Sequence, residues 1–557
     1  MIFQPRIFSV LKTYTKKQFY SDLMAGVIVG IVALPLAIAF GIASGVSPEK
    51  GLYTAIIAGF IISFLGGSKV QIGGPTGAFI VIVYGIVQQY GITGLAIATF
   101  IAGVILVVMG FLKLGTIIKF IPYPVVVGFT SGIALTIFAT QVKDFLGLHI
   151  ERMPADFIQK WIEYVKNIST INVWALLVGI FTILIITLTP KITKKIPGSL
   201  IAIIAMTALV YLLRTKFGIN NIETIGDKFN ISATLPHATT PAINFDTIRT
   251  LLPVAFTIAM LGAIESLLSA TVADGVIGDR HDSNTELIAQ GIANIITPIF
   301  GGIPATGAIA RTMTNINNGG KTPIAGIIHA IVLGIILLFL GNLTKHIPMA
   351  CLAGVLMIVA YNMSEWRTFR SLMRNSKSDV AVLITTFLLT VIFDLTIAVE
   401  IGLLMAILLF IKRISETSTI SVLTNKIDST YAEQGMNNDE LDIPKGVEVY
   451  EIEGPFFFGL ANKFDEIMKQ MGDKPRIRII RMRNVPFIDS TGIHNLENLI
   501  RMSHKENITI LLSGVNQNVK KSLETANINQ IIGDENICSN INQAMQRANQ
   551  LMKNTVK

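Results

Sequence analysis

The feature that most constrains this chain is a succession of apolar stretches, each about as long as a bilayer is thick, that fills the sequence up to Arg413. A helix needs about 20 mostly apolar residues to cross the hydrocarbon layer, and fewer where it is broken inside the protein. With 51% hydrophobic and only 15% charged residues, the chain is too apolar to wrap its core in a polar surface. The sequence therefore predicts a multi-pass protein of the lipid bilayer.

Counting on this rule gives about fourteen membrane segments, all helical. In the first half of the chain they cover 21–44, 49–66, 76–88, 93–112, 124–146, 171–190 and 197–214. In the second half they cover 247–275, 284–300, 307–317, 323–342, 346–363, 379–393 and 395–412. The segments that begin near Thr76 and Thr306 are too short to cross alone, so they are predicted half-helices.

The two halves of the membrane region repeat each other. Thr76-Gly77-Ala78 recurs as Thr306-Gly307-Ala308, and Ile121-Pro122 recurs at nearly the same offset as Ile347-Pro348. An odd number of segments per copy inserts the second copy upside down, which predicts a 7+7 inverted repeat.

Charge sets the expected orientation. The net charge is +9, but the basic residues lie mostly at the edges of apolar segments, on one side if both termini are cytoplasmic. This distribution explains the excess of positive charge without nucleic-acid binding, so we expect no nucleic-acid partner.

The composition changes after Arg413. A polar linker over 416–445 is followed by 446–557, where short β-rich runs alternate with amphipathic stretches. Strands are expected at 447–454, 476–483 and 508–514, and helices are expected to start near Leu460, Thr491, Asn516 and Asn540. We predict a cytoplasmic α/β domain.

The stretches "GGPTGAFI" (73–80) and "GGIPATGAIAR" (301–311) break the apolar pattern with glycine and proline. Unpaired backbone groups are costly in lipid, so such breaks are tolerated only where they pack in protein or line a cavity. In an inverted repeat the two half-helix starts can face each other, offering free N–H groups and positive dipole ends to an anion. The candidate substrate-binding residues are Thr76, Gly77, Ala78, Gly307 and Ala308.

Arg311 lies one helical turn after Gly307 and Ala308. Its guanidinium could add positive charge to the anion site, because a mid-membrane arginine is expensive without a use or a partner. The alternative is an arginine that extends to the cytoplasmic boundary of a short helix.

Glu265 is a carboxylate in the middle of an apolar helix, with Ser269 four residues later on the same face. A carboxylate in the central cavity can take up a proton, which would couple anion movement to a proton gradient. The alternative is a permanent salt bridge between Glu265 and Arg311 that only joins two helices.

The quoted stretches, together with "SPEKGLYTAIIAGFIISFLGGS", "GFTSGI" and "MLGAIESLLSATVADG", resemble the sulfate permease (SulP) family of anion transporters over essentially the whole chain. The resemblance implies elevator-like alternating access, a homodimer and an anion site at Thr76, Gly77, Ala78, Gly307, Ala308 and Arg311. It also implies the following domains: transport core 1–112 and 247–342, gate 113–246 and 343–415, linker 416–445 and a STAS domain 446–557.

Within the family, "LGAIESLL" and "ATGAIAR" look closest to bacterial proton-coupled members that take up C4-dicarboxylates, which implies a bacterial-type inner (plasma) membrane location. Sodium-coupled bicarbonate members carry Asp in place of Glu265 and Thr in place of Ile309. These departures favour protons over sodium as the coupling ion. We also expect the protein to bind no cofactor and no metal.

"VPFIDSTGIHNLENL" carries the likeness to STAS domains, in which the serine matching Ser490 is phosphorylated in some bacterial regulators. Ser490 is therefore a candidate regulatory residue facing a cytoplasmic partner, and the alternative is a helix N-cap.

From these features we expect the protein to carry out secondary active transport of a sulfate-, bicarbonate- or C4-dicarboxylate-type anion by proton symport. The sequence has no GxxxxGK[ST] nucleotide site, so we expect neither a pump nor an enzyme. The alternatives are an anion-sensing signalling protein acting through STAS and a proton-coupled nucleobase transporter.

Overall fold

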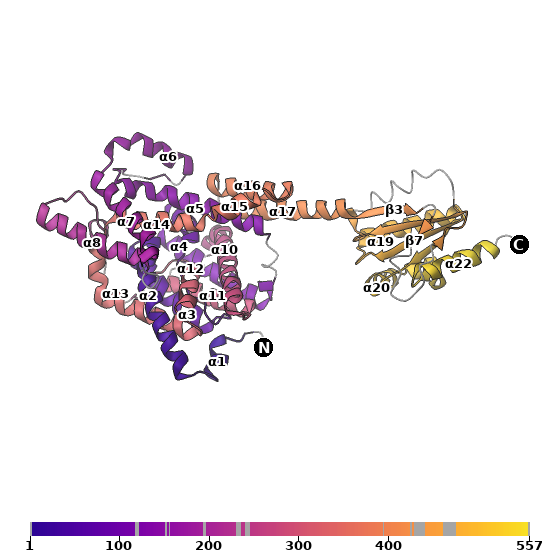
Figure 1. Cartoon of the computed structure of the whole chain (residues 1–557), viewed down its shortest axis with the longest axis horizontal. Coiled ribbons are helices and arrows are strands. Elements are labelled where there is room, and N and C mark those ends of the chain that lie inside the picture. Colours follow the sequence, from indigo (N-terminus) through magenta and orange to yellow (C-terminus); the bar gives the residue numbers. More distant parts are fainter. Residues whose placement is uncertain are drawn as a thin grey trace. The chain divides into compact units, whose positions relative to one another are not determined.

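The computed structural model describes residues 3–116, 122–150, 153–154, 156–192, 197–229, 236–239, 245–393, 395–423, 426–427, 441–459 and 475–554. The chain forms two compact units, Met1–Ala406 and Ile407–Lys557. Figure 1 shows that the first is built of helices and that the second contains a sheet with helices packed on it.

The helices of the first unit follow the predicted apolar segments closely. The first half contains α1 (Arg6–Leu11), α2 (Lys16–Ala43), α3 (Pro48–Leu65), α4 (Ile80–Phe111), α5 (Tyr123–Leu146), α6 (Phe157–Lys166), α7 (Val173–Ile192), α8 (Gly198–Phe217) and α9 (Ile225–Lys228). The second half contains α10 (Phe245–Ile277), α11 (Ser283–Ile299), α12 (Ile309–Asn317), α13 (Pro323–Leu340), α14 (Met349–Met363), α15 (Trp366–Leu372), α16 (Lys377–Ile392) and the first part of α17 (Leu395–Thr417), whose residues after Ala406 belong to the second unit.

Helix α4 joins two predicted segments, 76–88 and 93–112. Its backbone leaves the helical conformation at Gly91, with φ 69° and ψ −176°, a region that glycine enters without a steric penalty. The first part of α4 is thus a half-helix, and the nine residues of α12 form the other. Eight helices of the described residues are long and apolar enough to span a membrane, so the count of fourteen spans stays a prediction.

Helix α6 lies in the stretch 147–170, between two of the predicted apolar segments, where the sequence analysis predicts no helix. Asp156 starts the helix, and its carboxylate accepts a hydrogen bond from the Gln159 N–H at 2.9 Å. The helix was missed because it is too short and too polar to be a span.

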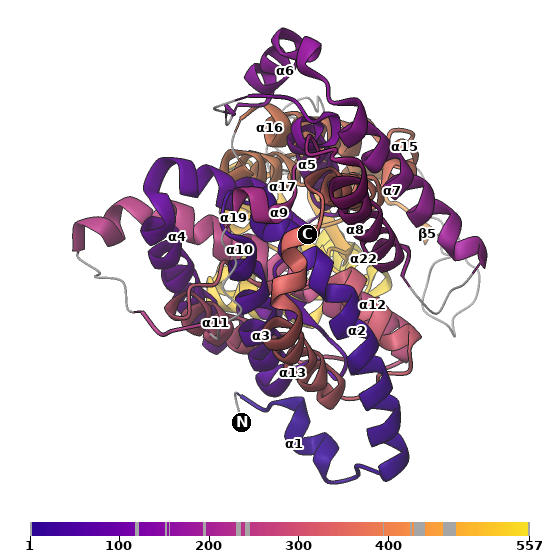
Figure 2. The same cartoon turned by 90° about the vertical axis from the view of Figure 1, so that its left-hand side faces the viewer.

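The helices of the first unit pack into two sets (Figure 2). One set consists of α2, α3, α4, α10, α11, α12 and α13, and the other of α5, α7, α8, α14 and α16. The first set comes from 1–112 and 247–342, the second from the ranges between and after them. The assignment of these sets as moving core and gate stays a prediction.

Helices α4 and α11 approach each other at backbone distance. A Cβ on Gly291 of α11 would lie 2.6 Å from the Gly103 carbonyl oxygen and 2.7 Å from the Val107 nitrogen of α4. A Cβ on Gly103 would lie 2.7 Å from the Gly291 carbonyl oxygen. Small residues at both positions therefore let two membrane helices pack closely.

We expect Gly291→Ala to lower the stability of the folded protein by about 1–3 kcal/mol, because the added methyl meets backbone that cannot move aside. Thermal unfolding in detergent, followed by size exclusion, measures this loss. Gly275→Ala in α10 is the control, since a Cβ there meets nothing within 4 Å. Equal melting temperatures for the two variants would contradict the proposed close packing.

The second unit is an α/β domain around a five-stranded mixed sheet. The strand order is β3 (Thr419–Leu423), β6 (Val447–Glu453), β7 (Ile477–Asn484), β8 (Thr509–Ser513), β9 (Ile537–Cys538). β3 pairs antiparallel with β6, and the other pairs are parallel. A separate two-stranded pair joins β4 (Lys426–Ile427) to β5 (Leu441–Asp442).

Each face of this sheet has its own core. Ile480 packs on one face with α19 (Ser490–Lys505), α20 (Gln517–Thr525) and α21 (Ile528–Ile532). Ile479, its neighbour in β7, packs on the other face with α22 (Ile541–Asn554), because side chains alternate along a strand.

The three predicted strands of this domain are confirmed, and so are helices starting near 491, 516 and 540. The predicted start near Leu460 lies outside the described residues. Within the stretch 416–445, expected to be a linker, α17 continues to Thr417 and β3 follows it, and the domain boundaries stay a prediction. The strand was missed because it is a short edge strand in a polar stretch.

Candidate functional site

The two glycine-proline breaks meet inside the first unit. β1 (Gly73–Gly74) pairs antiparallel with β2 (Thr306–Gly307), with Gly73 opposite Gly307 and Gly74 opposite Thr306. The Ala308 N–H extends the pairing by donating to the Ile72 carbonyl at 2.9 Å. The pairing satisfies backbone groups that lipid could not, and it puts one break from each half side by side.

Glycine is required at this crossing by space and by backbone conformation. Gly74 has φ 145°, and a Cβ there would lie 2.4 Å from Nη1 of Arg311. A Cβ on Gly307 would lie 1.8 Å from Nε2 of Gln71. The side chains of Arg311 and Gln71 therefore occupy the room that these glycines leave.

A helix start follows each strand. Thr76 is extended and precedes a short 3-10 turn, η1 (Gly77–Phe79), which continues into α4. Gly77 and Ala78 are buried, and the Phe79 N–H closes the first turn by donating to the Thr76 carbonyl at 3.3 Å. The amides of Gly77 and Ala78 therefore precede the first closed turn.

Among the described residues of the second half of the chain, the backbone N–H groups without a hydrogen-bond partner lie further along the sequence than the sequence analysis predicted. Gly307 belongs to β2 and Ala308 donates to Ile72, so the Ala308 N–H cannot also bind a ligand. The first turn of α12 instead leaves the amides of Ile309, Ala310 and Arg311 without intrahelical partners. Helix α12 starts later than expected because strand pairing keeps Gly307 extended.

Thr76 adds a hydroxyl to this region. Its Oγ1 is buried and has no hydrogen-bond partner in the part of the chain that the structure describes. A buried hydroxyl without a partner is costly, so this group is available to a ligand or a water molecule.

Arg311 is only 3% exposed, and its guanidinium crosses from α12 to the loop of the other half. Nη1 donates to the Gly73 carbonyl at 3.4 Å, and Nη2 donates to the Pro75 carbonyl. The alternative in which Arg311 extends to the membrane boundary is therefore wrong. Among the described residues no carboxylate pairs with Arg311, so none of them neutralises its charge.

Glu265 lies in α10 and is 8% exposed. Helix α10 reaches the crossing one turn earlier, where the Thr306 hydroxyl donates to the Gly262 carbonyl at 2.9 Å. Within the described ranges, Glu265 has neither a hydrogen bond nor an ion pair. The salt bridge to Arg311, considered as an alternative, is absent there.

Ser269 is buried about one helical turn after Glu265 in α10. Its hydroxyl donates to Oγ1 of Thr312 in α12 at 3.3 Å. Ser269 thus joins α10 to the second half-helix, and its predicted part in coupling stays a prediction.

Sequence reasoning missed a chain of buried polar groups behind the crossing. Nε2 of Gln71 donates to the Ser266 hydroxyl at 2.8 Å, and that hydroxyl donates to Oε1 of Glu286 at 3.4 Å. Oε2 of Glu286 accepts from the N–H groups of Gly67 and Ser68 at 2.8 and 3.1 Å. Each residue alone looks like ordinary helix or loop polarity, so no spacing in the sequence could have indicated the chain.

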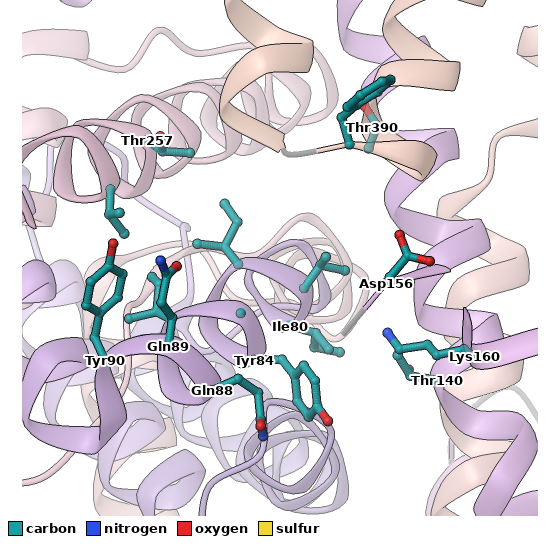
Figure 3. A pocket seen from close by; sticks show the side chains of 16 residues that line it. Ile80, Tyr84, Gln88, Gln89, Tyr90, Thr140, Asp156, Lys160, Thr257 and Thr390 are labelled. Atoms are coloured by element: carbon teal, nitrogen blue, oxygen red, sulfur yellow. The ribbon is translucent and has the colours of Figure 1, made fainter. Parts of the chain in front are cut away.

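A cavity of about 450 Å³ begins at Ile80, the first residue of α4 (Figure 3). Its polar lining comes from α4, α5, the start of α6, α10 and α16. These lining residues are Tyr84, Gln88, Gln89, Tyr90, Thr140, Asp156, Lys160, Thr257 and Thr390. The cavity gives a space of mixed apolar and polar lining next to the first helix start.

The second unit places Ser490 at the first position of α19, where it is exposed. The N-cap is Asp489, whose carboxylate accepts from the Gly492 N–H at 2.7 Å and from the Phe458 N–H at 3.2 Å. The interpretation of Ser490 as the capping residue is therefore wrong by one position. Its regulatory role stays a prediction.

No three His, Cys, Asp or Glu side chains lie together in a way that could hold a metal ion, as far as the described residues extend.

Comparison with known proteins gives a consistent picture along the chain. The sulfate permease family model matches residues 19–386, and the STAS domain model matches residues 440–544. "Putative sulfate transporter YvdB" of Bacillus subtilis is 42% identical over 526 residues, which cover 94% of this chain and 97% of that protein. Bicarbonate transporter BicA of Picosynechococcus sp. is 30% identical over 520 residues, covering 90% of each.

Solved structures agree in fold. The transmembrane domain of a cyanobacterium bicarbonate transporter, BicA, matches with a TM-score of 0.62 and 30% identity, covering 71% of this chain and 98% of that chain. The overall structure of SLC26A9 matches with a TM-score of 0.86 at 19% identity, covering 98% of this chain and 93% of that chain. The expected likeness to dicarboxylate transporters finds no support among these relatives. The chain belongs to the sulfate permease family and carries a C-terminal STAS domain.

Proposed function

We propose that this protein is a secondary active anion transporter whose cargo binds between the starts of α4 and α12. The observation that carries the proposal is the charge of Arg311, which is buried beside two helix starts and has no carboxylate partner among the described residues. An unpaired buried ion costs several kcal/mol, so such a site favours a ligand of opposite charge.

The cargo is a small anion of the sulfate, bicarbonate or C4-dicarboxylate class. Backbone N–H groups and one guanidinium recognise negative charge and oxygen acceptors better than overall shape. Among the relatives above, the names specify sulfate and bicarbonate, which makes these two inorganic anions the first to test.

Glu265 supplies the coupling. It is a buried carboxylate with no hydrogen bond or ion pair among the described residues, and such a group inside a membrane is suited to bind and release a proton. Protonation removes a negative charge one turn from the crossing, where an anion must bind. Proton and anion therefore favour each other, which is symport.

Transport proceeds by elevator-like alternating access. The two helix sets provide the parts: α2, α3, α4, α10, α11, α12 and α13 form the core, which moves against the gate formed by the other set. The protein acts as a homodimer in a bacterial-type inner membrane, with both termini and the STAS domain in the cytoplasm.

Uptake into proteoliposomes tests the proposal. With the outside made acidic, we expect accumulation of at least one of radiolabelled sulfate, bicarbonate and succinate above its equilibrium level. Excess unlabelled anions, added singly, identify the preferred cargo. Binding of an anion without any flux would contradict transport and favour the sensing alternative acting through STAS.

A further inference from the structure

The cavity beside α4 contains a buried lysine that the proposed site does not use. Lys160 of α6 is only 2% exposed and lines the cavity. Its Nζ lies 5.5 Å from the centroid of the Tyr84 ring on α4, within the range of a cation–π interaction. Lysine is rarely buried without a carboxylate partner, so its presence here calls for an explanation.

The nearest candidate partner does not neutralise Lys160. Asp156 caps α6, and its carboxylate accepts from the Gln159 N–H. Within the described residues, Lys160 and Asp156 are not at ion-pair distance, although the carboxylate acts on the amine electrostatically. Figure 3 shows both residues on one side of the cavity with Thr140, across from Gln88, Gln89 and Tyr90.

The position of this cavity indicates a function for Lys160 in the entry of the anion. With both termini in the cytoplasm, as the charge pattern predicts, α6 lies outside the membrane and the cavity opens at the outer face. Ile80, which follows directly after the helix start that is proposed to bind cargo, is one of the residues that line the cavity. An anion arriving from outside would therefore reach Lys160 before it reaches the helix starts.

We propose that Lys160 forms an outer anion-binding site, with the side-chain amide of Gln88, that captures the cargo before it moves to the crossing. The proposal rests on the proposed function, because the ligand is the transported anion. The low-dielectric walls of the cavity strengthen the field of one ammonium group and raise the local anion concentration.

The charge of this site depends on pH. Burial lowers the pKa of Lys160 to about 8, and the Asp156 carboxylate opposes that shift. The titratable groups that line the cavity with it are Tyr84 and Tyr90 on α4 and Asp156 at the start of α6. Helices α5 and α16 also pack against α6, and they carry Lys143, Asp144, Lys377 and Asp379. Among the described residues, α10 and α16 contribute no charged side chain to the lining of the cavity. Lys160 is cationic below about pH 8 and neutral above it, so anion capture weakens as the external pH rises through that value.

Substitutions of Lys160 distinguish a role in anion capture from a role in folding. Exchange of labelled anion is measured at equal internal and external pH, with whichever of sulfate, bicarbonate and succinate gives the fastest wild-type flux. We expect Lys160→Gln to raise the external KM about tenfold at neutral pH and to leave the maximal rate within about twofold. Lys166→Gln is the matched control, because Lys166 is on the same helix with its side chain 63% exposed and paired with Glu163.

Lys160→Arg distinguishes charge from packing. Arginine stays protonated, so this variant should keep a low KM at alkaline pH, where the wild-type KM rises. A KM for Lys160→Gln equal to that of wild type overturns the proposal, and so does a loss confined to the maximal rate or to the yield of folded protein.

A binding measurement tests the site without transport. Acetic anhydride acetylates neutral lysines, and peptide mass spectrometry compares Lys160 with Lys166 with and without sulfate, bicarbonate or succinate. We expect one of these anions to slow acetylation of Lys160 and to leave Lys166 unaffected. Lack of protection by all three overturns the outer site, whereas protection without any flux contradicts the proposed transport and leaves the binding site in place.

Discussion

Glu265→Gln should abolish uphill accumulation of anion under an imposed pH gradient while leaving exchange of anion at equal pH. Glutamine has nearly the shape of a protonated glutamate, so the site remains able to bind anion but can no longer bind and release a proton. The accumulation ratio should fall to about one, since a carrier uncoupled from protons only equilibrates its cargo. Labelled uptake into proteoliposomes, with and without the gradient, measures both quantities.

Glu400→Gln provides the control for this result. Glu400 is also a carboxylate within a helix of the membrane region, α17, but its side chain is exposed rather than enclosed. Its removal should leave both accumulation and exchange at the wild-type level. Unaltered uphill uptake by Glu265→Gln would remove Glu265 from the coupling mechanism and direct attention to other buried groups.

Arg311→Gln should lower transport about a hundredfold or more. The substitution removes the buried positive charge and deprives the Gly73 and Pro75 carbonyls of their donor. Hydrogen bonds to a charged group contribute about 1.5–3 kcal/mol each, and the attraction for the anion is lost in addition. Initial uptake rates over a range of anion concentrations measure the effect.

Arg311→Lys keeps the protein charge and separates binding from folding. A lysine cannot donate in a planar fork to two carbonyls, so we expect intermediate transport. Because a ligand stabilises the state that it binds, sulfate or bicarbonate should raise the melting temperature of the wild type more than that of this variant. A normal KM in Arg311→Gln would show that the anion binds elsewhere.

Much of the membrane fold could be predicted because lipid imposes a strict rule on the sequence. A stretch such as Tyr123–Leu146 is apolar for as long as a bilayer is thick, and helix is the structure that satisfies its backbone there. The breaks at 73–80 and 301–311 could be predicted for the same reason. Helix α6 could not be, since a short amphipathic helix outside the apolar segments has no length rule to reveal it.

The site was predictable only in outline. Residue types placed Arg311 one turn after the second break, but its acceptors, Gly73 and Pro75, depend on a crossing between segments more than two hundred residues apart. A shift of about one residue at a helix start moved the free amides from Ala308 to Ile309 and the cap from Ser490 to Asp489. No sequence pattern indicated Lys160, because its burial depends on helices from other parts of the fold, α4, α5 and α16.

The pairing of β1 with β2 has a consequence for how such a protein could have arisen. Each half of the chain contributes one strand, Gly73–Gly74 or Thr306–Gly307, so neither half can satisfy its own interrupted backbone. A polypeptide of half this length would need a second copy threaded through the membrane in the opposite sense. A gene fusion of two such copies would turn a dual-topology pair, dependent on chance encounters, into one molecule with its counterpart permanently attached.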